Sequence, residues 1–193
     1  MDSNPIVKQY SNEYQDQVID LILHIQQQEY NIPITKDDQP DLFAIEDFYQ
    51  TGNGNFWVAI YNDQVVGTIS LLDIDNNQVA LRKMFVNKEF RGAKYKTASL
   101  LLKTAIKWAK EHSVNDVYLG TTPQFLAAHR FYEKNGFTSI GLNELPENFP
   151  TFSFKYSNNL NSFAYNQNKR TDIFLFWAIL MKNTRRIKSS KRV

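Results

Sequence analysis

The first thirty residues contain a short apolar run, followed by a segment whose apolar positions recur at helical spacing. Residues 6–10 predict an opening strand. In the stretch that follows, apolar side chains lie three or four residues apart, at Tyr14, Val18, Leu21, Ile22 and Ile25. Residues 12–30 are therefore expected to form an amphipathic helix whose apolar face packs against the rest of the chain.

A second helix is predicted after Pro40, a residue that suits the first turn of a helix. Its apolar positions recur every three residues and are Leu42, Ile45 and Phe48. Asp37 or Asp38 is expected to cap its N-terminus. The sequence "GNG" at residues 52–54 ends the pattern.

Between residues 56 and 86 the pattern changes to short β-rich runs, which are "NFWVAIY", "QVVGTISLLDI" and "QVALRKMFV". The turn signals "ND" and "DNN" separate these runs at hairpin-like spacing, so the segment predicts three antiparallel strands. Arg82 and Lys83 are neighbours on the third run. They are therefore expected to face opposite sides of the sheet.

The apolar stripe of a buried helix follows, formed by Ala98, Leu101, Leu102, Ala105, Ile106 and Ala109. The run "DVYLGTT" at residues 116–122 then predicts a strand parallel to the one before that helix, since strand–helix–strand crossovers are normally parallel. Thr122 and Pro123 suit the start of a further helix, and Gly136 suits its left-handed end. A helix is expected at residues 123–135, with a short strand, "FTSIGL", after it.

The composition of the 193 residues is that of a globular protein. Apolar residues make up 42% and aromatic residues 14%, enough to bury a full core in a single globular unit. The absence of cysteine excludes disulfides, thiolate catalysis and cysteine zinc sites. The start, "MDSNPIVKQY", lacks the basic-then-apolar pattern of a signal peptide, so a cytoplasmic protein is expected.

Basic residues are concentrated near the end of the sequence. Residues 182–193 hold six Lys and Arg and no acid, and subtracting these six from the 22 basic residues leaves 16 against 20 acidic ones. The rest of the chain, residues 1–181, is therefore mildly acidic, which argues against nucleic acid as its partner. The apolar run "IFLFWAILM", residues 173–181, is far shorter than the about 20 residues that a membrane-spanning helix needs.

Three segments, "LRKMFVNKEFRG", "YLGTT" and "AAHRFYEKNGF", together with the order of the elements, resemble the GNAT superfamily of acyl-CoA-dependent N-acyltransferases. The resemblance covers roughly residues 3–150. It implies a mixed α/β (α+β) acyl-CoA N-acyltransferase fold, with a central, mostly antiparallel sheet, a splayed parallel pair and helices on both faces. We expect an N-acetyltransferase domain at residues 1–156 and an atypical tail at residues 157–193.

The tail does not match the usual ending of that family, which completes its sheet with a last strand and stops soon afterwards. One explanation is a reading-frame change that replaced the ending. Another is a real appendage whose apolar run docks on the body or lies on a membrane surface, with its basic end against anionic lipid.

The end of the third predicted strand and the loop after it resemble the acyl-CoA motif of the family. In that motif a strand edge binds the pantetheine arm and a loop holds the pyrophosphate. The residues that the resemblance assigns to acetyl-CoA are Met84, Phe85, Val86, Arg91, Gly92, Ala93, Lys94, Lys96, Thr97 and Ala98. The loop "RGAKYKTA" departs from the family pattern "R-G-x-G-x-[GA]" by an insertion, and Lys94, Lys96 or Thr97 stands where a glycine is expected. The other interpretation is a solvated basic turn that begins a helix.

The family motif "A-x-x-[LF]-Y-x-x-x-G-F" is matched by Ala128, Phe131, Tyr132, Gly136 and Phe137. Family members use this tyrosine as the general acid, so the resemblance assigns to Tyr132 the protonation of the departing thiolate. A phenol with a reference pKa of about 10 stays protonated at pH 7. The other interpretation is a core aromatic residue. Phe125 stands where many members have an asparagine that contacts coenzyme A.

The attacking amine must lose a proton, so a base or an ordered water is needed. Glu29, at the end of the first predicted helix, is the first candidate, and an exposed helix carboxylate is the other interpretation. His129 shares a helix face with Tyr132 and is either a base or a half-buried structural residue. Main-chain N–H groups near residues 84–86 would stabilise the oxyanion. The histidines are scattered, so no metal site is expected.

The expected activity is transfer of an acetyl group from acetyl-CoA to a primary amine of an unidentified small molecule or peptide. Asp37, Asp38 and Asp41 lie where the variable helix pair of the family forms the acceptor pocket; they either attract a cationic amine or form a solvated helix start. The alternative function is a catalytically impaired coenzyme A-binding or interaction module with a basic tail. The remaining expectations are no nucleic-acid partner, no transmembrane segment, weak contact of the tail with a membrane surface, and a homodimer.

Overall fold

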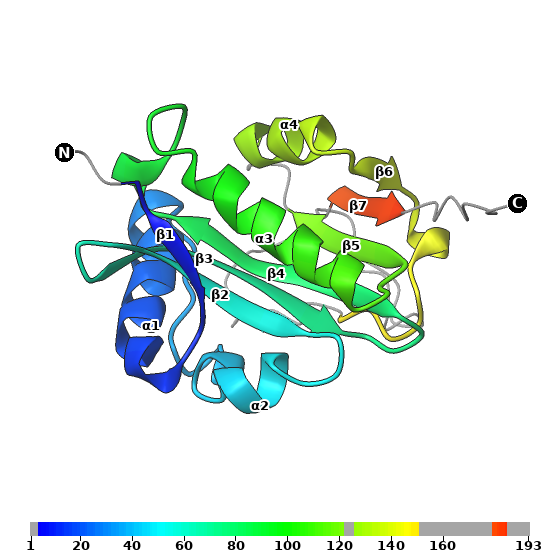
Figure 1. Ribbon diagram of the computed structural model, residues 1–193, viewed down its shortest axis with the longest axis horizontal. Coiled ribbons are helices and arrows are strands. Elements are labelled where there is room, and N and C mark those ends of the chain that lie inside the picture. Colours follow the sequence, from blue (N-terminus) through cyan, green and yellow to red (C-terminus); the bar gives the residue numbers. More distant parts are fainter. Residues whose placement is uncertain (1–3, 122–125, 151–178, 185–193) are drawn as a thin grey trace, which may run out of the picture. The chain divides into compact units, whose positions relative to one another are not determined.

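The chain divides into two compact units, residues 1–117 with 184–193 and residues 118–183. Figure 1 labels the helices and strands. The computed structural model describes residues 4–121, 126–150 and 179–184. Within these ranges, the first unit contains β1 to β4, the start of β5 and the helices α1, α2 and α3. The second unit contains the rest of β5, the helix α4 and the last strands.

The first four strands form an antiparallel meander in the order β1-β2-β3-β4. They are β1 (Ile6–Gln9), β2 (Asn55–Tyr61), β3 (Gln64–Asp73) and β4 (Gln78–Val86). The expected opening strand and the three expected antiparallel strands are therefore confirmed. The β2–β3 hairpin turns through Asn62 and Asp63, whose φ angles are 47° and 59°, because Asn and Asp tolerate the left-handed conformation that such a turn requires.

The first expected helix is present, but it is built from three helical geometries. A 3₁₀ turn at Asn12–Tyr14 leads into α1 (Gln15–His24), which continues as a π-helical turn at Ile25–Glu29. Of the apolar side chains predicted for one face, Tyr14 is partly buried and the other four are buried in the core of the first unit. π-Helical turns are rare and are often found at functional sites.

The second expected helix is shorter than its pattern suggested. A 3₁₀ turn at Pro40–Leu42 and the helix α2 at Ile45–Tyr49 replace one continuous helix. The cap expected at Asp37 or Asp38 is wrong, because Gln39 occupies the N-cap position. Asp38 instead accepts hydrogen bonds from the N–H and the hydroxyl of Thr35, at 2.9 and 2.7 Å, and so closes the preceding turn.

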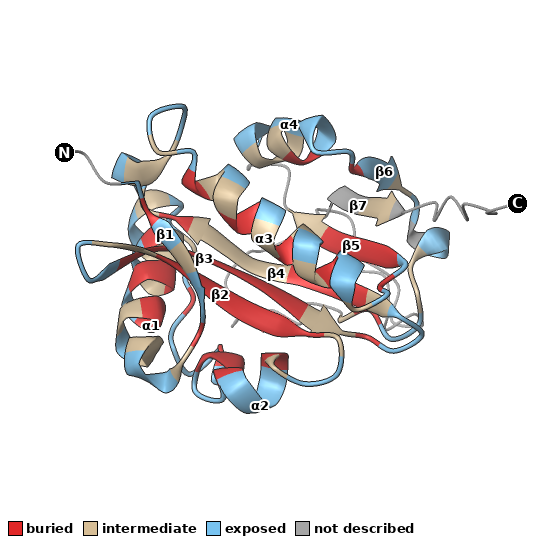
Figure 2. Cartoon of the chain, viewed as in Figure 1, coloured by how far each residue is buried: buried red, intermediate tan, exposed pale blue. Residues whose placement is uncertain are grey.

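Helices cover both faces of the sheet in the first unit. Neighbouring residues on a strand point to opposite faces. Phe56 and Val58 of β2 pack in the core formed with α1 and α2. Trp57, between them, contacts Trp108 of α3 (Thr97–Glu111), with 5.8 Å between ring centroids. Figure 2 shows that these strands are the most buried part of the unit, and the expected mixed α/β class is confirmed.

The helix α3 connects β4 to β5 (Asp116–Thr121). The starts of these two strands lie side by side, since the N–H of Asn115 donates to the carbonyl of Asn77 at 2.8 Å. Gln78 Nε2 also donates to Asp116 Oδ2 at 3.2 Å. Strands whose first residues adjoin run in the same direction, so the expected parallel crossover is confirmed.

The strands of the second unit follow the order β5-β7-β6. The helix α4 (Leu126–Lys134) precedes β6 (Thr138–Ile140), which pairs antiparallel with β7 (Ile179–Thr184). Gly136 follows α4 with a φ angle of 85°, as expected for a left-handed helix end. The strand expected after this glycine is confirmed as β6.

Some expectations concern residues outside the described ranges. These are the helix start at residues 122–123, the substitution at Phe125, and residues 157–178 and 185–193 of the tail. The described part of the tail, residues 179–184, is the strand β7. Along the described ranges, every helix is too short or too polar to cross a membrane.

Candidate active site

The loop between β4 and α3 enters the helix through a left-handed residue. After a 3₁₀ turn at Lys88–Phe90, the chain passes Gly92, with a φ angle of 83°, and reaches Lys96, with a φ angle of 53°. Lys96 is the residue immediately before α3, and it adopts the left-handed conformation that the family pattern assigns to glycine. The exposed residues of the loop are Gly92, Ala93, Lys94 and Lys96.

The first turn of α3 packs closely on the sheet. A Cβ atom at Gly67 of β3 would lie 3.0 Å from Leu101 Cδ1 and 3.3 Å from Thr97 Cγ2, so a larger residue there would push the helix away. The hydroxyl of Thr97 is buried and has no hydrogen-bond partner among the described residues. The first N–H groups of a helix also lack intrahelical acceptors, so this helix start fits a phosphate-bearing ligand.

Three aromatic rings pack together beside the loop. The ring of Tyr95 lies 5.7 Å from that of Tyr61 and 4.8 Å from that of Phe90. The Lys94 ammonium lies 4.7 Å from the centroid of Tyr95. Because Tyr61 ends β2, this packing attaches the loop to the end of the sheet.

Arg91 and Glu29, both expected site residues, form an ion pair. The terminal nitrogens of the guanidinium donate to the two carboxylate oxygens, at 2.7 and 3.0 Å, and Nε donates to the carbonyl of Val86 at 2.7 Å. This is the planar two-point geometry in which arginine binds carboxylates strongly. The pair joins the π-helical turn at the end of α1 to the β4–α3 loop.

The strand β4 contains a β-bulge at Lys83. Thr68 pairs with Phe85 and Ser70 pairs with Arg82, so two residues of β4 lie opposite one residue of β3. Lys83 has a φ angle of 49°. Among the described residues other than glycine, it is the only strand residue with a left-handed backbone.

The bulge corrects the expectation that Arg82 and Lys83 face opposite sides of the sheet. Arg82 Cζ lies 6.0 Å from the ring centroid of Phe48 in α2. Lys83 Nζ lies 3.0 Å from Asp41 Oδ2, just before α2. The expectation was wrong because a bulge inserts an extra residue and breaks the two-residue alternation of side chains.

The Lys83 ammonium is the centre of a buried polar cluster. Besides its contact with Asp41, it donates to Gln39 Oε1 at 2.8 Å, and Gln39 Nε2 donates to Gln26 Oε1 at 3.0 Å. Asp41 also accepts a hydrogen bond from the hydroxyl of Tyr49. The side chains of Lys83 and Asp41 are only 8% and 10% exposed. Asp41 is therefore neither part of a solvated helix start nor available to attract a cationic amine.

Burial controls protonation in this cluster. It lowers the pKa of Lys83, and the Asp41 carboxylate opposes that shift. It also raises the pKa of Tyr49 well above the ordinary value of a phenol. A buried charge is costly without a partner, so Lys83 and Asp41 depend on each other.

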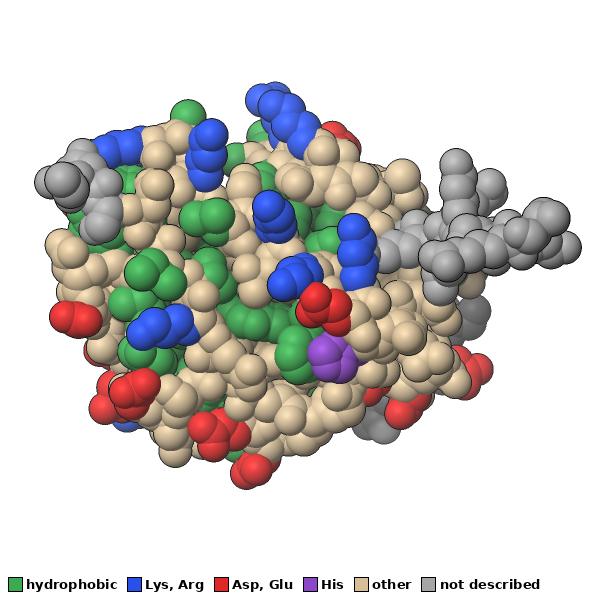
Figure 3. Space-filling view, viewed as in Figure 1, with side chains coloured by type: hydrophobic (Ala, Val, Ile, Leu, Met, Phe, Trp, Pro, Cys, Tyr) green, Lys and Arg blue, Asp and Glu red, His purple; other side chains and the backbone are tan. Residues whose placement is uncertain are grey.

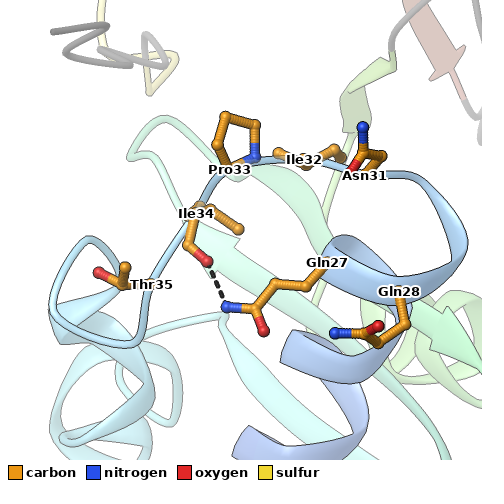
Figure 4. A pocket seen from close by; sticks show the side chains of 7 residues that line it. All are labelled: Gln27, Gln28, Asn31, Ile32, Pro33, Ile34 and Thr35. Atoms are coloured by element: carbon orange, nitrogen blue, oxygen red, sulfur yellow. Dashed lines mark hydrogen bonds between the residues drawn. The ribbon is translucent and has the colours of Figure 1, made fainter.

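A hollow of 570 Å³ adjoins the end of the first helix (Figure 4). The residues that line it are Gln27, Gln28, Asn31, Ile32, Pro33, Ile34 and Thr35. Gln27 Nε2 donates to the carbonyl of Ile34 at 2.6 Å and ties the helix end to the loop that follows. The lining is uncharged and mixes amide and hydroxyl side chains with apolar ones, and Glu29 comes directly after its helical part.

Basic side chains lie along α3, which faces the viewer in Figure 3. They are Lys103, Lys107 and Lys110, and Lys107 pairs with Glu111 at 3.6 Å. Acidic side chains lie toward α1 and α2 in the same view. These lysines lie in the middle and last turns of α3, away from its first turn at Thr97.

Tyr132 lies in α4 of the second unit and is buried. Its ring is 5.6 Å from that of Phe131 and 5.4 Å from that of Phe137. Burial raises the pKa of its hydroxyl, so the phenol stays protonated through the neutral range. This environment suits a proton donor and a core aromatic residue alike. His129, one turn before it, is half-buried.

A family model, described as the acetyltransferase (GNAT) family, matches residues 19–137. The matched range includes the bulged strand β4, the β4–α3 loop and α4. The chain belongs to the GNAT acetyltransferase family. The motifs in its sequence led us to expect this family.

Known proteins of this GNAT family resemble the chain in sequence and in fold. An N-acetylaspartate synthetase of Danio rerio is 39% identical over 106 residues, which cover 54% of this chain and 37% of that protein. A GNAT-family acetyltransferase from Staphylococcus aureus Mu50 has a crystal structure that matches with a TM-score of 0.75 and 36% identity, covering 93% of this chain and 98% of that one. An acetyltransferase from Streptococcus agalactiae matches with a TM-score of 0.75 and 27% identity, covering 95% and 99%. The expected acyl-CoA N-acyltransferase fold is confirmed.

The structure of this GNAT-family protein links two expected site residues and also brings Lys83 and Asp41 into contact, which the sequence did not indicate. Glu29 and Arg91 are brought together as an ion pair, whereas Tyr132 belongs to the other unit. The pairing of Lys83 with Asp41 was not predicted, because a bulge at a lysine leaves no glycine signal and an aspartate after a proline is typical of a solvated helix start. No group of three or more His, Asp and Glu side chains among the described residues could hold a metal ion.

Proposed function

We propose that the protein transfers an acetyl group from acetyl-CoA to a primary amine. The observation that carries this proposal is the start of α3, where an exposed basic loop meets a buried hydroxyl without a partner, that of Thr97. The pyrophosphate would accept hydrogen bonds from main-chain N–H groups of residues 92–98, aided by the helix dipole. Lys94 and Lys96 would add cationic donors.

The end of β4 would bind the pantetheine arm and the thioester. Residues 84–86 follow the bulge directly, and a main-chain N–H there would donate to the thioester oxygen as it becomes an oxyanion. The side chain of Phe85 packs against the core of the first unit and Val86 is buried. The main chain, and not the side chains, would therefore make these contacts.

Tyr132 would act as the general acid. The amine nitrogen attacks the thioester carbon, the carbon–sulfur bond breaks, and the departing thiolate takes the phenolic proton. Solvent then returns a proton to the tyrosine, so the products are an amide and coenzyme A with a free thiol. A pKa raised by burial keeps this acid protonated at alkaline pH.

Glu29 or an ordered water would take the proton of the attacking amine. The carboxylate of Glu29 already accepts hydrogen bonds from Arg91, so an incoming proton would arrive at an ion-paired group. Arg91 has further N–H groups beyond those it uses here, and these could donate to the pyrophosphate. The pair would thus connect the cofactor loop to the side where the amine arrives.

The acceptor would occupy the hollow beside Gln27 and Gln28. Its lining is uncharged and partly apolar, which supports recognition by hydrogen bonds and apolar contacts rather than by a fixed charge. The similarity to N-acetylaspartate synthetases makes aspartate the first acceptor to test, followed by other amino acids, polyamines and peptides. The chain spans 37% of the length of the Danio rerio protein, so its acceptor has to be determined by experiment.

The test combines calorimetric titration with acetyl-CoA and an assay of free thiol release with these amines. We expect binding and amine-dependent release of coenzyme A. The variant Tyr132→Phe should bind acetyl-CoA as before but lower kcat by about 100-fold, the usual contribution of a general acid. The matched control is Tyr14→Phe, a tyrosine of the first helical turn.

The possible negative results of these assays distinguish between the alternatives. Binding without turnover by any amine would favour the coenzyme A-binding module instead. No binding would overturn the proposed function. An unchanged kcat in Tyr132→Phe would make Tyr132 a core aromatic residue.

A further inference from the structure

Lys83 combines two unfavourable features at one position. Its left-handed backbone, with a φ angle of 49°, is unfavourable for a residue with a side chain. Its ammonium is also buried, which disfavours the charged form. Residues that keep such strain are held by their surroundings and cluster at functional sites.

The bulge at Lys83 is held from two directions. On the sheet side, Thr68 Oγ1 of β3 donates to the carbonyl of Lys83 at 2.7 Å. On the helix side, Lys83 Nζ contacts Asp41 Oδ2 at 3.0 Å and Gln39 Oε1 at 2.8 Å. Both the main chain and the side chain of this one residue are therefore anchored.

The helix-side anchor is itself fixed to the core. Gln39 is buried and exchanges a hydrogen bond with Gln26 of the π-helical turn. Asp41 accepts from the hydroxyl of Tyr49, whose side chain is fully buried. Lys83 thus fastens β4 to two separate helical segments.

We propose that Lys83 is a positioning residue for acetyl transfer, because its contacts with Asp41 and Gln39 hold the bulge that directs the main-chain N–H groups of residues 84–86. This inference rests on the proposed function, in which those groups meet the thioester. If the contacts with Asp41 and Gln39 are removed, the strained backbone relaxes toward a regular strand and the peptide planes after the bulge rotate. A displacement of about 1 Å at reacting atoms costs about 100-fold in rate.

Two double variants separate the shape of the bulge from the charge of the lysine. Lys83→Met with Asp41→Asn removes both charges and leaves a side chain that resists the left-handed backbone. Lys83→Gly with Asp41→Asn removes the same charges, but glycine adopts a positive φ angle without strain. Neither variant leaves an unpaired buried charge, so we expect both variants to fold.

We expect the methionine variant to lose about 100-fold in kcat while its KM for acetyl-CoA changes less than about threefold, because the thioester is misaligned rather than unbound. The glycine variant should recover at least about tenfold of that loss, because its bulge persists without the lysine contacts. The control is Lys107→Met, which removes a lysine from the exposed pair on α3.

Two outcomes would overturn the inference. If the glycine variant is as slow as the methionine variant, the ammonium itself is required. If both keep the rate of the unmodified protein and only their melting temperatures fall, the cluster is purely structural.

Crystal structures of the two variants give a readout that does not depend on activity. The φ angle at residue 83 and the hydrogen bond from Thr68 should persist in the glycine variant and be lost in the methionine variant. If the bulge behaves in this way but the unmodified protein transfers no acetyl group, the proposed function fails while the role of Lys83 in holding the bulge stands. A bulge that persists in the methionine variant contradicts the inference directly.

Discussion

Two ion pairs join β4 and its following loop to the helical segment before β2, and they differ in burial. Lys83 and Asp41 are 8% and 10% exposed, whereas Arg91 and Glu29 are 35% and 19% exposed. Water can replace a lost partner at the second pair but not at the first. The difference suggests that the buried pair fixes the geometry of the strand, while the more exposed pair can exchange partners when an anionic ligand arrives.

Breaking the buried pair from one side should have the largest effect on stability. Asp41→Asn leaves the Lys83 ammonium buried opposite a neutral amide, and loss of one partner of a buried pair costs about 3–5 kcal/mol. Urea unfolding would measure this loss. Glu111→Gln, which breaks the exposed pair on α3, is the control; an equal loss in both variants would contradict the importance of burial.

Raising the pH should relieve part of the cost of burying Lys83. Its pKa is lower in the folded protein than the ordinary value of 10.5, so between these two pKa values the unfolded chain binds more protons. Stability should therefore rise with pH through that window, by about 1.4 kcal/mol for each unit of difference. The measurement compares the unmodified protein with the Lys83→Met, Asp41→Asn double variant from pH 7 to pH 10, which cancels other titrating groups. If the difference in free energy of unfolding between the two proteins stays constant over this pH range, the prediction is wrong.

Breaking the more exposed pair should change stability little and ligand binding visibly. Glu29→Gln should lower the free energy of unfolding by less than about 1 kcal/mol, because water can solvate the Arg91 guanidinium once the carboxylate is gone. It also frees Arg91 for the pyrophosphate, so calorimetry should show the Kd for coenzyme A falling about threefold, which corresponds to roughly 0.6 kcal/mol. Weaker binding would mean that Glu29 orients Arg91 and does not compete for it.

The smallest effect is expected at the fully solvated pair. Lys107→Met, with its partner Glu111, should change the free energy of unfolding by no more than about 0.5 kcal/mol. This value sets the lower end of the scale against which the two other pairs are compared. A loss as large as that of Asp41→Asn would remove burial as the explanation for the whole series.

The strands and the long helix of the first unit could be predicted because their patterns are local. Alternating and helical spacing of apolar residues reports which side of an element is buried, and the runs at residues 56–86 and 98–109 show this clearly. The second helix was overestimated because a three-residue apolar spacing does not reveal where the backbone leaves the helical region. Ala44, between its two parts, has a φ angle of −137°.

The candidate site could be predicted only in part. Glu29 and Arg91 were both expected from their motifs or positions, but nothing in the sequence indicated that they bind each other across 62 positions. Arg82 and Lys83 were wrongly placed on opposite sides of the sheet because the alternation rule assumes an unbroken strand. Both roles considered for Asp41, attraction of an amine and a solvated helix start, assumed that it is accessible, because its short-range context resembles that of a helix start.

The sequence by itself determined the order of the elements and the acyltransferase motifs, since both depend on residues close together in the chain. Only the tertiary structure decided that Lys83 bulges out of β4 and that its charge is neutralised by Asp41. The physical reason is that a left-handed lysine and a buried carboxylate are each unfavourable alone. They become stable when folding brings the two residues, 42 positions apart in the numbering, into contact.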